Sequence, residues 1–413
     1  MSIIREIPPT AGWPVYVKDI FASLAKPQKY TSSFEESFNG YLGVAHFKII
    51  NSGTSALYLI LETLKTLSTR KSVVIPSFIC PLVPLAVYRA GLSAEVCDIS
   101  SDRFDFDYIQ LEKTCAGNSD ILAIVAAHIA GLPLEIDRIK AIAKKYNIFI
   151  IEDCAQSMGA VYQDYQTGSF GDFSFFSLCR GKGLTIYEGG IAVAKNQDHS
   201  AALDETFERL IRDNKFSEAL KILEIFGYWA FYRPLGFWYI FRLPSVYWQF
   251  RGRPLKALIE EFTPDFEVHK ISGFRKRLIS QQFERLEGNI KKQRAKAQFY
   301  IDKISRIKGV RLITELPDSS SNYPFLTCLI EDMAKRDNIL TELERSGLGF
   351  SRIYAKAICD YDYLSGIIAP DKNCLNARQV ARRHITISTS IFLDDRDLVN
   401  IVERLKRGLA FKQ

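Results

Sequence analysis

Short apolar runs alternate with helical patterns from about residue 50 to residue 195. Strands are predicted at 73–76, 94–99, 121–127, 148–152, 173–178 and 190–194, and helices at 55–67, after Pro81 and at 135–146. This alternation predicts an α/β fold in which a mainly parallel sheet of seven-stranded type carries helices on both faces. Such a sheet places its chemistry at the carboxyl ends of its strands.

The pattern changes after Asp198. Residues 200–225 read as helical, and 277–307 read as one long charged helix. The remainder predicts a strand at 323–330, a helix at 332–346, a strand at 385–389 and a helix at 394–409. We therefore expect a large domain over 1–260 and a smaller α+β domain over 261–413.

Length and composition favour a globular protein. The chain has 413 residues, of which 47% are hydrophobic and 24% charged, which argues against disorder. A net charge of +7 suits an anionic substrate or a membrane surface but demonstrates neither, and we expect no nucleic-acid partner.

The spacing of the cysteines and histidines predicts neither a metal site nor an oxidising compartment. The eight cysteines form no CxxC pair, and the five histidines form no HxxxH or HExxH arrangement. Unpaired cysteines suggest a reducing compartment, and the N-terminus has no long apolar run typical of a signal peptide. We expect a cytoplasmic protein.

Residues 51–57, NSGTSAL, place glycine and small hydroxyl groups before an apolar helix. Free N–H groups and the helix dipole at such a start favour an anion, so this helix start is a candidate phosphate site. The alternative is a simple N-cap, with Ser52 or Thr54 as the capping oxygen.

Asp153 ends the apolar run at 148–152. A buried aspartate is costly without a cationic partner, and a protonated pyridine nitrogen would be such a partner. An aspartate that caps the next helix is the alternative reading.

Lys182 lies between two glycines just after the aromatic strand at 173–178. Imine chemistry needs an amine that can become neutral, whereas a lysine in a surface turn is the alternative. Ser177, five residues earlier, is a second candidate phosphate ligand. Glu188-Gly189-Gly190 follows, and its glycines let the backbone pass close to a bulky neighbour.

Taken together, these stretches resemble the DegT/DnrJ/EryC1/StrS family of pyridoxal-phosphate (PLP) aminotransferases, known largely for acting on nucleotide-linked keto-sugars. The resemblance covers roughly residues 30–410 apart from an aromatic-rich segment, and it implies fold type I, the fold of aspartate aminotransferase. The matching stretches are NSGTSAL (51–57), VVIPSF (73–78), AAHIAGLP (126–133), IIEDCAQSMGA (150–160), GDFSFFSLCRGKGLTIYEGG (171–190) and, more weakly, QQFERLEGNIKKQRAKAQFY (281–300).

The resemblance also implies a role for each site residue. Lys182 would bind PLP covalently and carry a proton between substrate and cofactor, and Asp153 would pair with the pyridine nitrogen. Gln156 would hydrogen-bond the phenolic oxygen, while Thr54, Ser55, the backbone of Gly53 and Ser177 would hold the phosphate. Family members are homodimers in which the partner subunit completes the site.

The chain departs from the family at three positions. Cys80 stands where an aromatic side chain usually stacks on PLP, so Phe78 or another side chain takes that place or stacking is weaker. Val268 stands where an asparagine is usually donated to the partner's phosphate, and His269 or Lys270 is a candidate substitute. Arg180 adds a cation beside Lys182. This cation would favour the neutral form of the lysine or bind a substrate phosphate, and a structural salt bridge is the alternative.

Three further residues near the predicted site are expected to have structural roles. His128 could contact substrate, but we expect it to be a structural histidine. Cys154 and Cys179 are expected to be small packing residues rather than nucleophiles.

An aromatic-rich segment over about 221–256, densest at 226–250, holds three of the four tryptophans and several arginines. Pro234 and Pro244 interrupt it, which argues against a membrane-spanning helix. A dimer or interdomain contact is the favoured reading, and peripheral contact with anionic lipid on the inner face of a membrane is the alternative.

The predicted function is transfer of an amino group from an amino acid, L-glutamate by family analogy, to a keto acceptor. The acceptor is expected to be a nucleotide- or lipid-linked keto-sugar used for a cell-surface polysaccharide. A PLP-fold dehydratase and a non-catalytic scaffold are the alternatives; the retained Lys182 argues against both.

Overall fold

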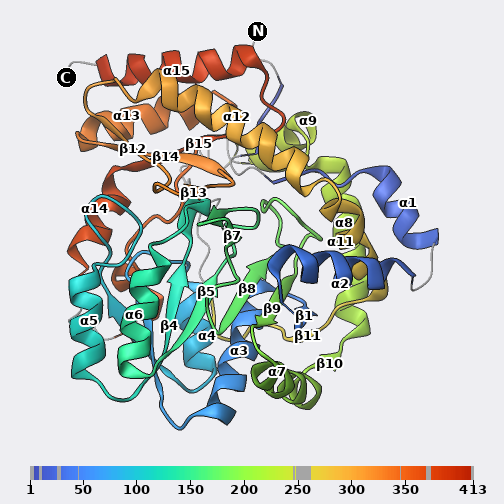
Figure 1. Cartoon of the computed structure of the whole chain (residues 1–413). Coiled ribbons are helices and arrows are strands. Elements are labelled where there is room, and N and C mark those ends of the chain that lie inside the picture. The colour runs from blue at the N-terminus through green and yellow to red at the C-terminus, as the bar shows by residue number, and fades with distance from the viewer. Residues whose placement is uncertain are drawn as a thin grey trace.

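The computed structural model describes residues 4–8, 12–25, 29–44, 46–244, 247, 262–344, 346–368 and 374–410. A large α/β part occupies the lower half of the view in Figure 1, and a smaller α+β part lies above it. The N-terminal and C-terminal ends of the chain both lie at the smaller part.

The large sheet has nine strands in the order β10, β11, β1, β9, β8, β5, β4, β2 and β3. Neighbours from β8 to β3 run parallel, whereas β9 is antiparallel to both β8 and β1. The predicted mainly parallel sheet is confirmed, but it has nine strands rather than seven, because the short strands β10 and β11 extend one edge. The strands are β1 (His46–Ile50), β2 (Ser72–Pro76), β3 (Ser93–Cys97), β4 (Ile121–Ala127), β5 (Phe149–Asp153), β8 (Phe173–Ser177), β9 (Gly190–Ala194), β10 (Arg212–Asp213) and β11 (His269–Lys270).

Helices cover both faces of this sheet because its strands are apolar on both sides. On β2, Val73 and Ile75 pack into one core, while Val74 packs into another together with residues of α5 and α6. Helix α3 contacts β8, β9, α4 and α7 on the first face. The helices are α3 (Gly53–Leu67), α4 (Leu82–Arg89), α5 (Tyr108–Gly117), α6 (Ile136–Tyr146) and α7 (Gln197–Leu210).

The smaller part is built on a three-stranded antiparallel sheet in the order β12, β14 and β15. A second small sheet joins β13 to β6 and β7 of the large part. The elements are β6 (Val161–Tyr162), β7 (Tyr165–Gln166), α12 (Leu286–Ile304), β12 (Val310–Ile313), β13 (Ser319–Ser320), β14 (Phe325–Ile330), α13 (Met333–Glu344), the 3-10 turns η4 (Ile358–Asp360) and η5 (Asp362–Leu364), α14 (Leu375–Arg383), β15 (His384–Ser388) and α15 (Asp395–Ala410).

The long helix predicted over 277–307 is wrong, because the chain forms two helices there. Helix α11 (Gly273–Phe283) ends before Glu284, and α12 begins at Leu286. At the break, the Arg285 guanidinium is held by the Asp19 carboxylate at 2.6 Å and by the carbonyl oxygen of Gln281 at 2.9 Å. Asp19 belongs to α1 (Val17–Ala25), which with α2 (Lys29–Leu42) packs against α11. This tertiary contact lies outside the reach of a helical periodicity.

The boundary expected between residues 260 and 261 falls outside the described residues. Strand β11 still belongs to the large sheet, since Lys270 pairs with Ile50 of β1. We therefore propose a domain division after β11. The N-terminal segment crosses this division: Arg5 forms an ion pair with Asp397 at 2.7 Å, and Ile7 donates its N–H to Gly347.

Helix α8 (Lys215–Phe231), helix α9 (Pro234–Phe237) and the π-helical turn η2 (Trp238–Arg242) form the described part of the aromatic-rich segment. Among the described residues, no helix combines the length and apolarity that a bilayer crossing requires.

The expectation that all cysteines are unpaired is wrong for one pair, because Cys359 and Cys374 form a disulfide. Its partners are 15 residues apart, a pairing that spacing alone does not reveal.

Candidate active site

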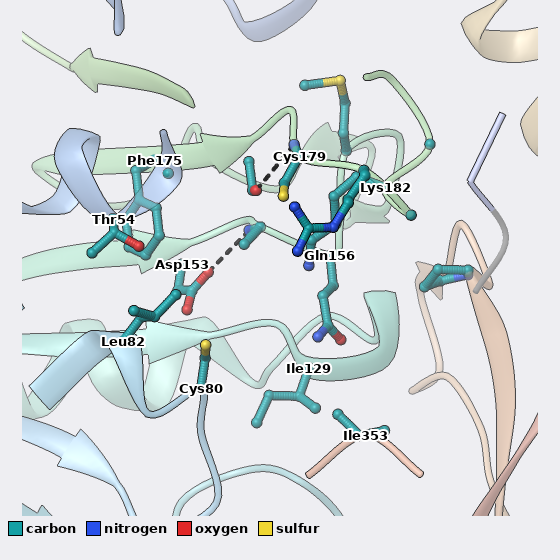
Figure 2. A pocket seen from close by; sticks show the side chains of 18 of the residues that line it. Thr54, Cys80, Leu82, Ile129, Asp153, Gln156, Phe175, Cys179, Lys182 and Ile353 are labelled. Carbon is teal, nitrogen blue, oxygen red and sulfur yellow. Dashed lines mark hydrogen bonds between the residues drawn. The ribbon is translucent and has the colours of Figure 1, made fainter. Parts of the chain in front are cut away.

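A pocket of about 570 Å³ lies between the large and the smaller part of the fold, beside the carboxyl ends of β4, β5 and β8. Thr54, Asp153, Gln156 and Lys182 converge around it in Figure 2. The smaller domain closes the pocket with residues 351–354 and Thr386. The position agrees with the general rule for open parallel sheets.

One end of the pocket is the start of α3. Ser52 caps this helix, because its hydroxyl oxygen accepts the N–H of Ser55 at 3.0 Å. Ser52, Gly53 and Thr54 line the pocket, and Ser177 of β8 lies against Gly53. A Cβ atom on Gly190 would come within 2.2 Å of the Ser52 carbonyl oxygen, so only glycine lets β9 pass this close. The result is a helix start with small hydroxyl groups, which suits a phosphate.

Ser55 does not lie where the sequence predicted, among the residues that would face the phosphate. Its hydroxyl group bonds the Ser52 hydroxyl at 2.7 Å and donates to the Glu267 carbonyl oxygen at 2.9 Å. The side chain is fully buried and does not line the pocket, since it serves the helix cap and anchors the stretch before β11. Ser52 takes its place on the pocket wall.

Asp153 ends β5 with its carboxylate toward the pocket. One oxygen accepts the Ala155 N–H at 2.9 Å, and no described residue donates a hydrogen bond to the other. Burial raises the pKa of Asp153, an effect opposed by the Ala155 N–H and by the positive charge of Lys182. A cation placed at the free oxygen would restore the charged form.

Gln156 has a fixed side-chain orientation. Its Oε1 accepts the Ala130 N–H at 2.7 Å, and its Nε2 donates to the Tyr354 hydroxyl at 3.3 Å. The second Nε2 hydrogen is not used by these two bonds, so the amide can donate to a ligand oxygen in the pocket.

Tyr354 supplies an aromatic side chain to the wall on which Cys80 also lies. Burial raises the pKa of Tyr354, and the nearby Cys80 and Asp153 add to the rise, so the phenol stays protonated. Phe78, the first substitute considered for the missing aromatic, is fully buried and stacks on Phe104 with ring centroids 5.6 Å apart. It does not line the pocket, because its ring belongs to the core beneath Tyr354.

Lys182 extends into the pocket from the loop after β8, and no described residue accepts a hydrogen bond from its Nζ. Its backbone N–H donates to the Cys179 carbonyl oxygen at 3.1 Å, closing a tight turn. Gly181 adopts a φ of +78° in this turn, which explains the glycine beside the lysine. Arg180 also lines the pocket, as does Arg352 of the smaller domain.

Helix α8 supports this loop from outside. Tyr228 donates its hydroxyl hydrogen to the Trp13 carbonyl oxygen at 3.1 Å, and the Trp13 ring lies against Gly183. Lys221 forms an ion pair at 2.7 Å with Glu188, which lines the pocket. The aromatic-rich segment is therefore connected to the loop that carries Lys182.

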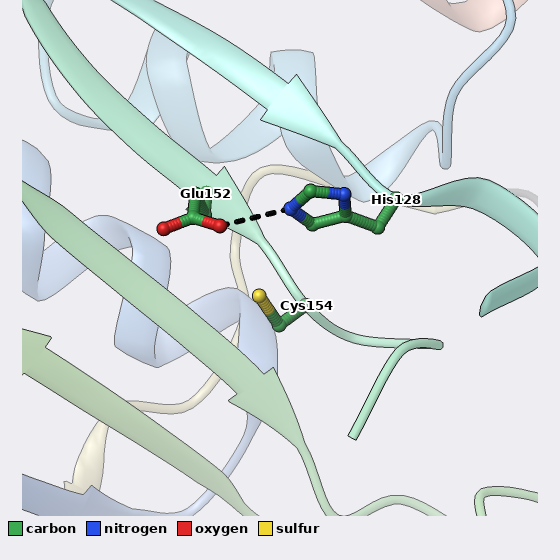
Figure 3. A group of neighbouring side chains, drawn as sticks. All are labelled: His128, Glu152 and Cys154. Carbon is green, nitrogen blue, oxygen red and sulfur yellow. Dashed lines mark hydrogen bonds and ion pairs between the residues drawn. The ribbon is translucent and has the colours of Figure 1, made fainter. Parts of the chain in front are cut away.

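His128, Glu152 and Cys154 form a buried group, shown in Figure 3. The ring of His128 donates through Nε2 to Glu152 at 2.9 Å, because its Nδ1 accepts the Leu134 N–H. Burial alone would raise the pKa of Glu152, but the bond from His128 and the N–H groups of Gly168 and Gly171 hold it below its usual range. Burial raises the pKa of the Cys154 thiol. His128 also lines the pocket, but both of its ring nitrogens are engaged in these bonds, so we propose that the three residues serve the framework.

Neither candidate substitute for the family asparagine lines this chain's own pocket. Lys270 forms an ion pair with the exposed Glu208 at 2.9 Å, and His269 is buried beside Glu218 at 3.5 Å. Cys179 lines the pocket, and burial raises the pKa of its thiol, which suits a packing role.

His384 of β15 fixes the segment that carries Arg352 and Tyr354. Its Nδ1 donates to the Val380 carbonyl oxygen at 2.9 Å, and its Nε2 accepts the Ile353 N–H at 3.0 Å. Burial lowers the pKa of His384 to about 4 despite the bond to Val380, and the charges of Arg352 and Arg336 contribute to the decrease. The neutral ring is therefore the form that the fold requires.

Stability is expected to decrease as the pH falls from about 6.5 to about 4, because the unfolded histidine takes up a proton that the folded one refuses. A difference of this size corresponds to roughly 3 kcal/mol at the acid end. Urea unfolding of wild type and His384→Gln across this range measures it. Between these pH values the unfolding free energy of the glutamine variant should fall less than that of wild type, by about this amount. Equal pH profiles of the two proteins would contradict the prediction.

The site residues fit PLP by their donor chemistry. The capped helix start with Ser177 suits the phosphate, the free Asp153 oxygen suits a protonated pyridine nitrogen, and Gln156 has a hydrogen for the phenolic oxygen. Tyr354, Arg352 and Trp13 complete the wall, and sequence reasoning missed all three. Their contacts join segments far apart in the chain, and none lies in a motif.

A family model described as the DegT/DnrJ/EryC1/StrS aminotransferase family matches residues 16–214 and 269–406. An uncharacterized protein of Methanocaldococcus jannaschii is 24% identical over 390 residues, covering 91% of this chain and 89% of that protein. A UDP-4-amino-4,6-dideoxy-N-acetyl-beta-L-altrosamine transaminase of Campylobacter jejuni is 36% identical over 175 residues. That alignment covers 41% of this chain and 45% of the transaminase, so the chain matches about half of that relative's length.

The fold also matches solved structures. A putative sugar aminotransferase of Streptococcus pneumoniae in its PMP form superposes with a TM-score of 0.77 at 19% identity. The superposition covers 98% of this chain and 97% of the other. The likeness shows the fold of a PLP-dependent aminotransferase.

Proposed function

Because this chain belongs to the DegT/DnrJ/EryC1/StrS aminotransferase family, we propose that it transfers an amino group from L-glutamate to a keto-sugar with PLP as its cofactor. The observation that carries the proposal is the free amine of Lys182 in a pocket shared with the buried Asp153. When bound, PLP supplies an electron sink for negative charge that develops at the substrate carbon.

Lys182 is the residue to which we assign the central role. Its Nζ, unengaged by described residues, would bind the cofactor covalently and afterwards move a proton at the substrate carbon. The tight turn from Cys179 to Lys182 fixes the backbone from which the lysine side chain extends into the pocket.

Asp153 and the start of α3 orient the cofactor from opposite ends. A protonated pyridine nitrogen beside the free Asp153 oxygen would offset the burial that raises its pKa. At the other end Gly53, Thr54 and Ser177 would hold the phosphate, and Gln156 would donate to the phenolic oxygen.

We assign to Tyr354 the aromatic contact that position 80 lacks. Tyr354→Leu is expected to weaken PLP binding by about two- to tenfold, the usual contribution of an aromatic pair. Equilibrium dialysis of PLP measures this without any turnover.

Two companion variants define this test. Tyr354→Phe keeps the ring and loses only the 3.3 Å hydrogen bond from Gln156, so it should retain most of the PLP affinity that Tyr354→Leu loses. Adding Cys80→Phe to Tyr354→Leu should recover much of the affinity, because an aromatic ring returns to that wall. Unchanged affinity in Tyr354→Leu would contradict the assignment.

The acceptor is, in our proposal, a nucleotide- or lipid-linked keto-sugar for a cell-surface polysaccharide. The name of the Campylobacter jejuni relative places it on a UDP-linked amino sugar. The cations of Arg180 and Arg352 on the pocket wall suit the phosphates of such a carrier.

We further propose a cytoplasmic homodimer in which the partner subunit completes the pocket. The stretch before Lys270 passes the start of α3, where the Glu267 carbonyl oxygen accepts bonds from Asn51 and Ser55, and Lys270 itself lies at the surface. Six cysteines remain free thiols, which supports a reducing compartment, with Cys359–Cys374 as the exception.

The visible absorbance of the purified, PLP-loaded protein tests the proposed function. Addition of L-glutamate should bleach the yellow band as the amino group moves to the cofactor, and addition of a keto-sugar nucleotide should restore it. A protein that takes up no PLP, or a band indifferent to every amino acid, would overturn the proposal.

A further inference from the structure

Residues 215–268 fall between the two ranges that match the family, and they contain an unusual run of side chains. From 225 to 259 the sequence has twelve aromatic residues and five arginines or lysines, with no aspartate or glutamate. We infer that α8, α9 and η2, together with α1, form a surface that binds an anionic lipid bilayer. We call it the aromatic–basic surface. The inference goes beyond the proposed reaction and does not depend on it.

Helix α8 exposes a continuous apolar stripe. Phe216, Leu220 and Leu223 are 76%, 46% and 68% exposed, and their spacing of four and three residues puts them on one face. Ala230 and Phe231 continue this face into the last turn of the helix, and both are exposed. Exposed large apolar side chains in such a row mark an interaction surface rather than ordinary surface scatter.

Helix α1 adds a second stripe beside the first. Val17, Phe21 and Leu24 are exposed at positions i, i+4 and i+7, while Asp19 is buried in its contact with Arg285. The two stripes meet at a shallow depression lined by the start of α1 and the end of α8. Its lining is Tyr16, Val17, Lys18, Trp229, Ala230 and Arg233.

Helix α9 and η2 extend the surface beyond α8. Leu235, Tyr239 and Ile240 are each at least half exposed, and Phe241 and Leu243 are also exposed. In Figure 1, α1, α8 and α9 lie on the same side of the molecule. The three helices therefore lie where one flat partner such as a bilayer could contact them together.

The charge of the segment identifies the occupant. Lys18, Lys215 and Arg233 lie on the described part of this surface. In contrast, its carboxylates Asp19, Glu218 and Glu224 each pair with a cation. A two-fold contact between copies of this chain would therefore bring like charges together. Anionic headgroups provide the missing negative charge, and aromatic rings with arginines suit the interface between headgroups and acyl chains. Since no described helix can span a bilayer, the surface would lie on the membrane.

The aromatic–basic surface is connected to the pocket through α8. The face of α8 opposite the stripe holds Trp13 through Tyr228 and Glu188 through Lys221, and both Trp13 and Glu188 line the pocket. Docking through the stripe would therefore hold the pocket close to the plane of the lipid headgroups.

The test is flotation of the full-length, PLP-loaded protein with vesicles of phosphatidylcholine alone or mixed with phosphatidylglycerol. We expect binding to the mixed vesicles, weakening at high salt, with a blue shift of tryptophan fluorescence. The variant Phe21→Asn/Leu223→Asn/Leu235→Asn should bind at least about tenfold more weakly. The matched control Ile109→Asn/Tyr165→Asn/Val399→Asn, which changes exposed apolar side chains elsewhere, should bind like wild type.

Three outcomes would overturn the inference, two of them in the vesicle assay and one in the absence of lipid. Wild type could remain unbound with the anionic vesicles, or the surface variant and its control could bind equally. Light scattering without lipid examines the other occupant: a fall in mass for the surface variant alone would assign the surface to a second copy of the chain. Unchanged mass together with lost vesicle binding supports the lipid surface.

Discussion

Lys182→Ala is expected to lower the rate of amine transfer by about 10⁴-fold or more, because one amine both binds the cofactor and moves the proton. The variant should still fold, since Lys182 Nζ forms no hydrogen bond with the described residues and the turn is held by backbone contacts. It should also still bind PLP through the phosphate and Asp153 contacts. Its loss of activity would therefore come from the chemical step and not from loss of the cofactor.

The measurement combines single-turnover rates with mass spectrometry after borohydride treatment. In wild type the cofactor should become fixed to the peptide that contains Lys182, and in the variant it should not. Lys113→Ala, which changes an exposed lysine on α5, is the control and should keep full activity. A Lys182→Ala enzyme within tenfold of wild type would show that another group performs the proton transfer.

Glu218→Ala is expected to cost roughly 3–5 kcal/mol of unfolding free energy, the usual effect of removing one member of a buried ion pair. Glu218 of α8 pairs with Arg275 of α11, and the Arg275 side chain is fully buried. Glu218 also accepts the Ser272 N–H at 2.6 Å. Without the carboxylate, the guanidinium and this N–H would both lose their buried partner.

Urea unfolding gives the comparison. Glu224→Ala removes a partly exposed carboxylate from the same helix and should cost about 1 kcal/mol or less. The double variant Glu218→Met/Arg275→Met should recover most of the lost stability, because no unpaired charge remains. If Glu218→Ala unfolds at the same urea concentration as Glu224→Ala, the pair does not stabilise the junction of α8 with α11.

Six of the nine strands of the large sheet could be predicted from local pattern, whereas β1, β10 and β11 were not predicted. The predicted ranges 121–127 and 190–194 coincide with β4 and β9, because fully buried strands need continuous apolar runs bounded by polar residues. Motif order also placed Asp153 and Lys182, since the carboxyl ends of parallel strands share one edge of the sheet.

Contacts between distant segments could not be predicted in this way. Tyr354 reaches Gln156 across 198 residues, and no periodicity encodes that approach. The Ser55 hydroxyl was assigned to phosphate because its residue type suits it, but the Glu267 carbonyl oxygen, 212 residues away, accepts its hydrogen bond instead. Arg285 breaks a helical pattern for the same reason, since Asp19 binds it from another helix.

The N-terminal segment has a consequence for how the protein is made. Arg5 and Ile7 take their partners from Asp397 and Gly347, which lie 392 and 340 residues later in the sequence. Ile7 is fully buried in the finished protein, so until then it stays exposed on the nascent chain. Residues 5–7 therefore reach their final place only after the segments that carry Gly347 and Asp397 have been synthesised, so this part of the fold forms late.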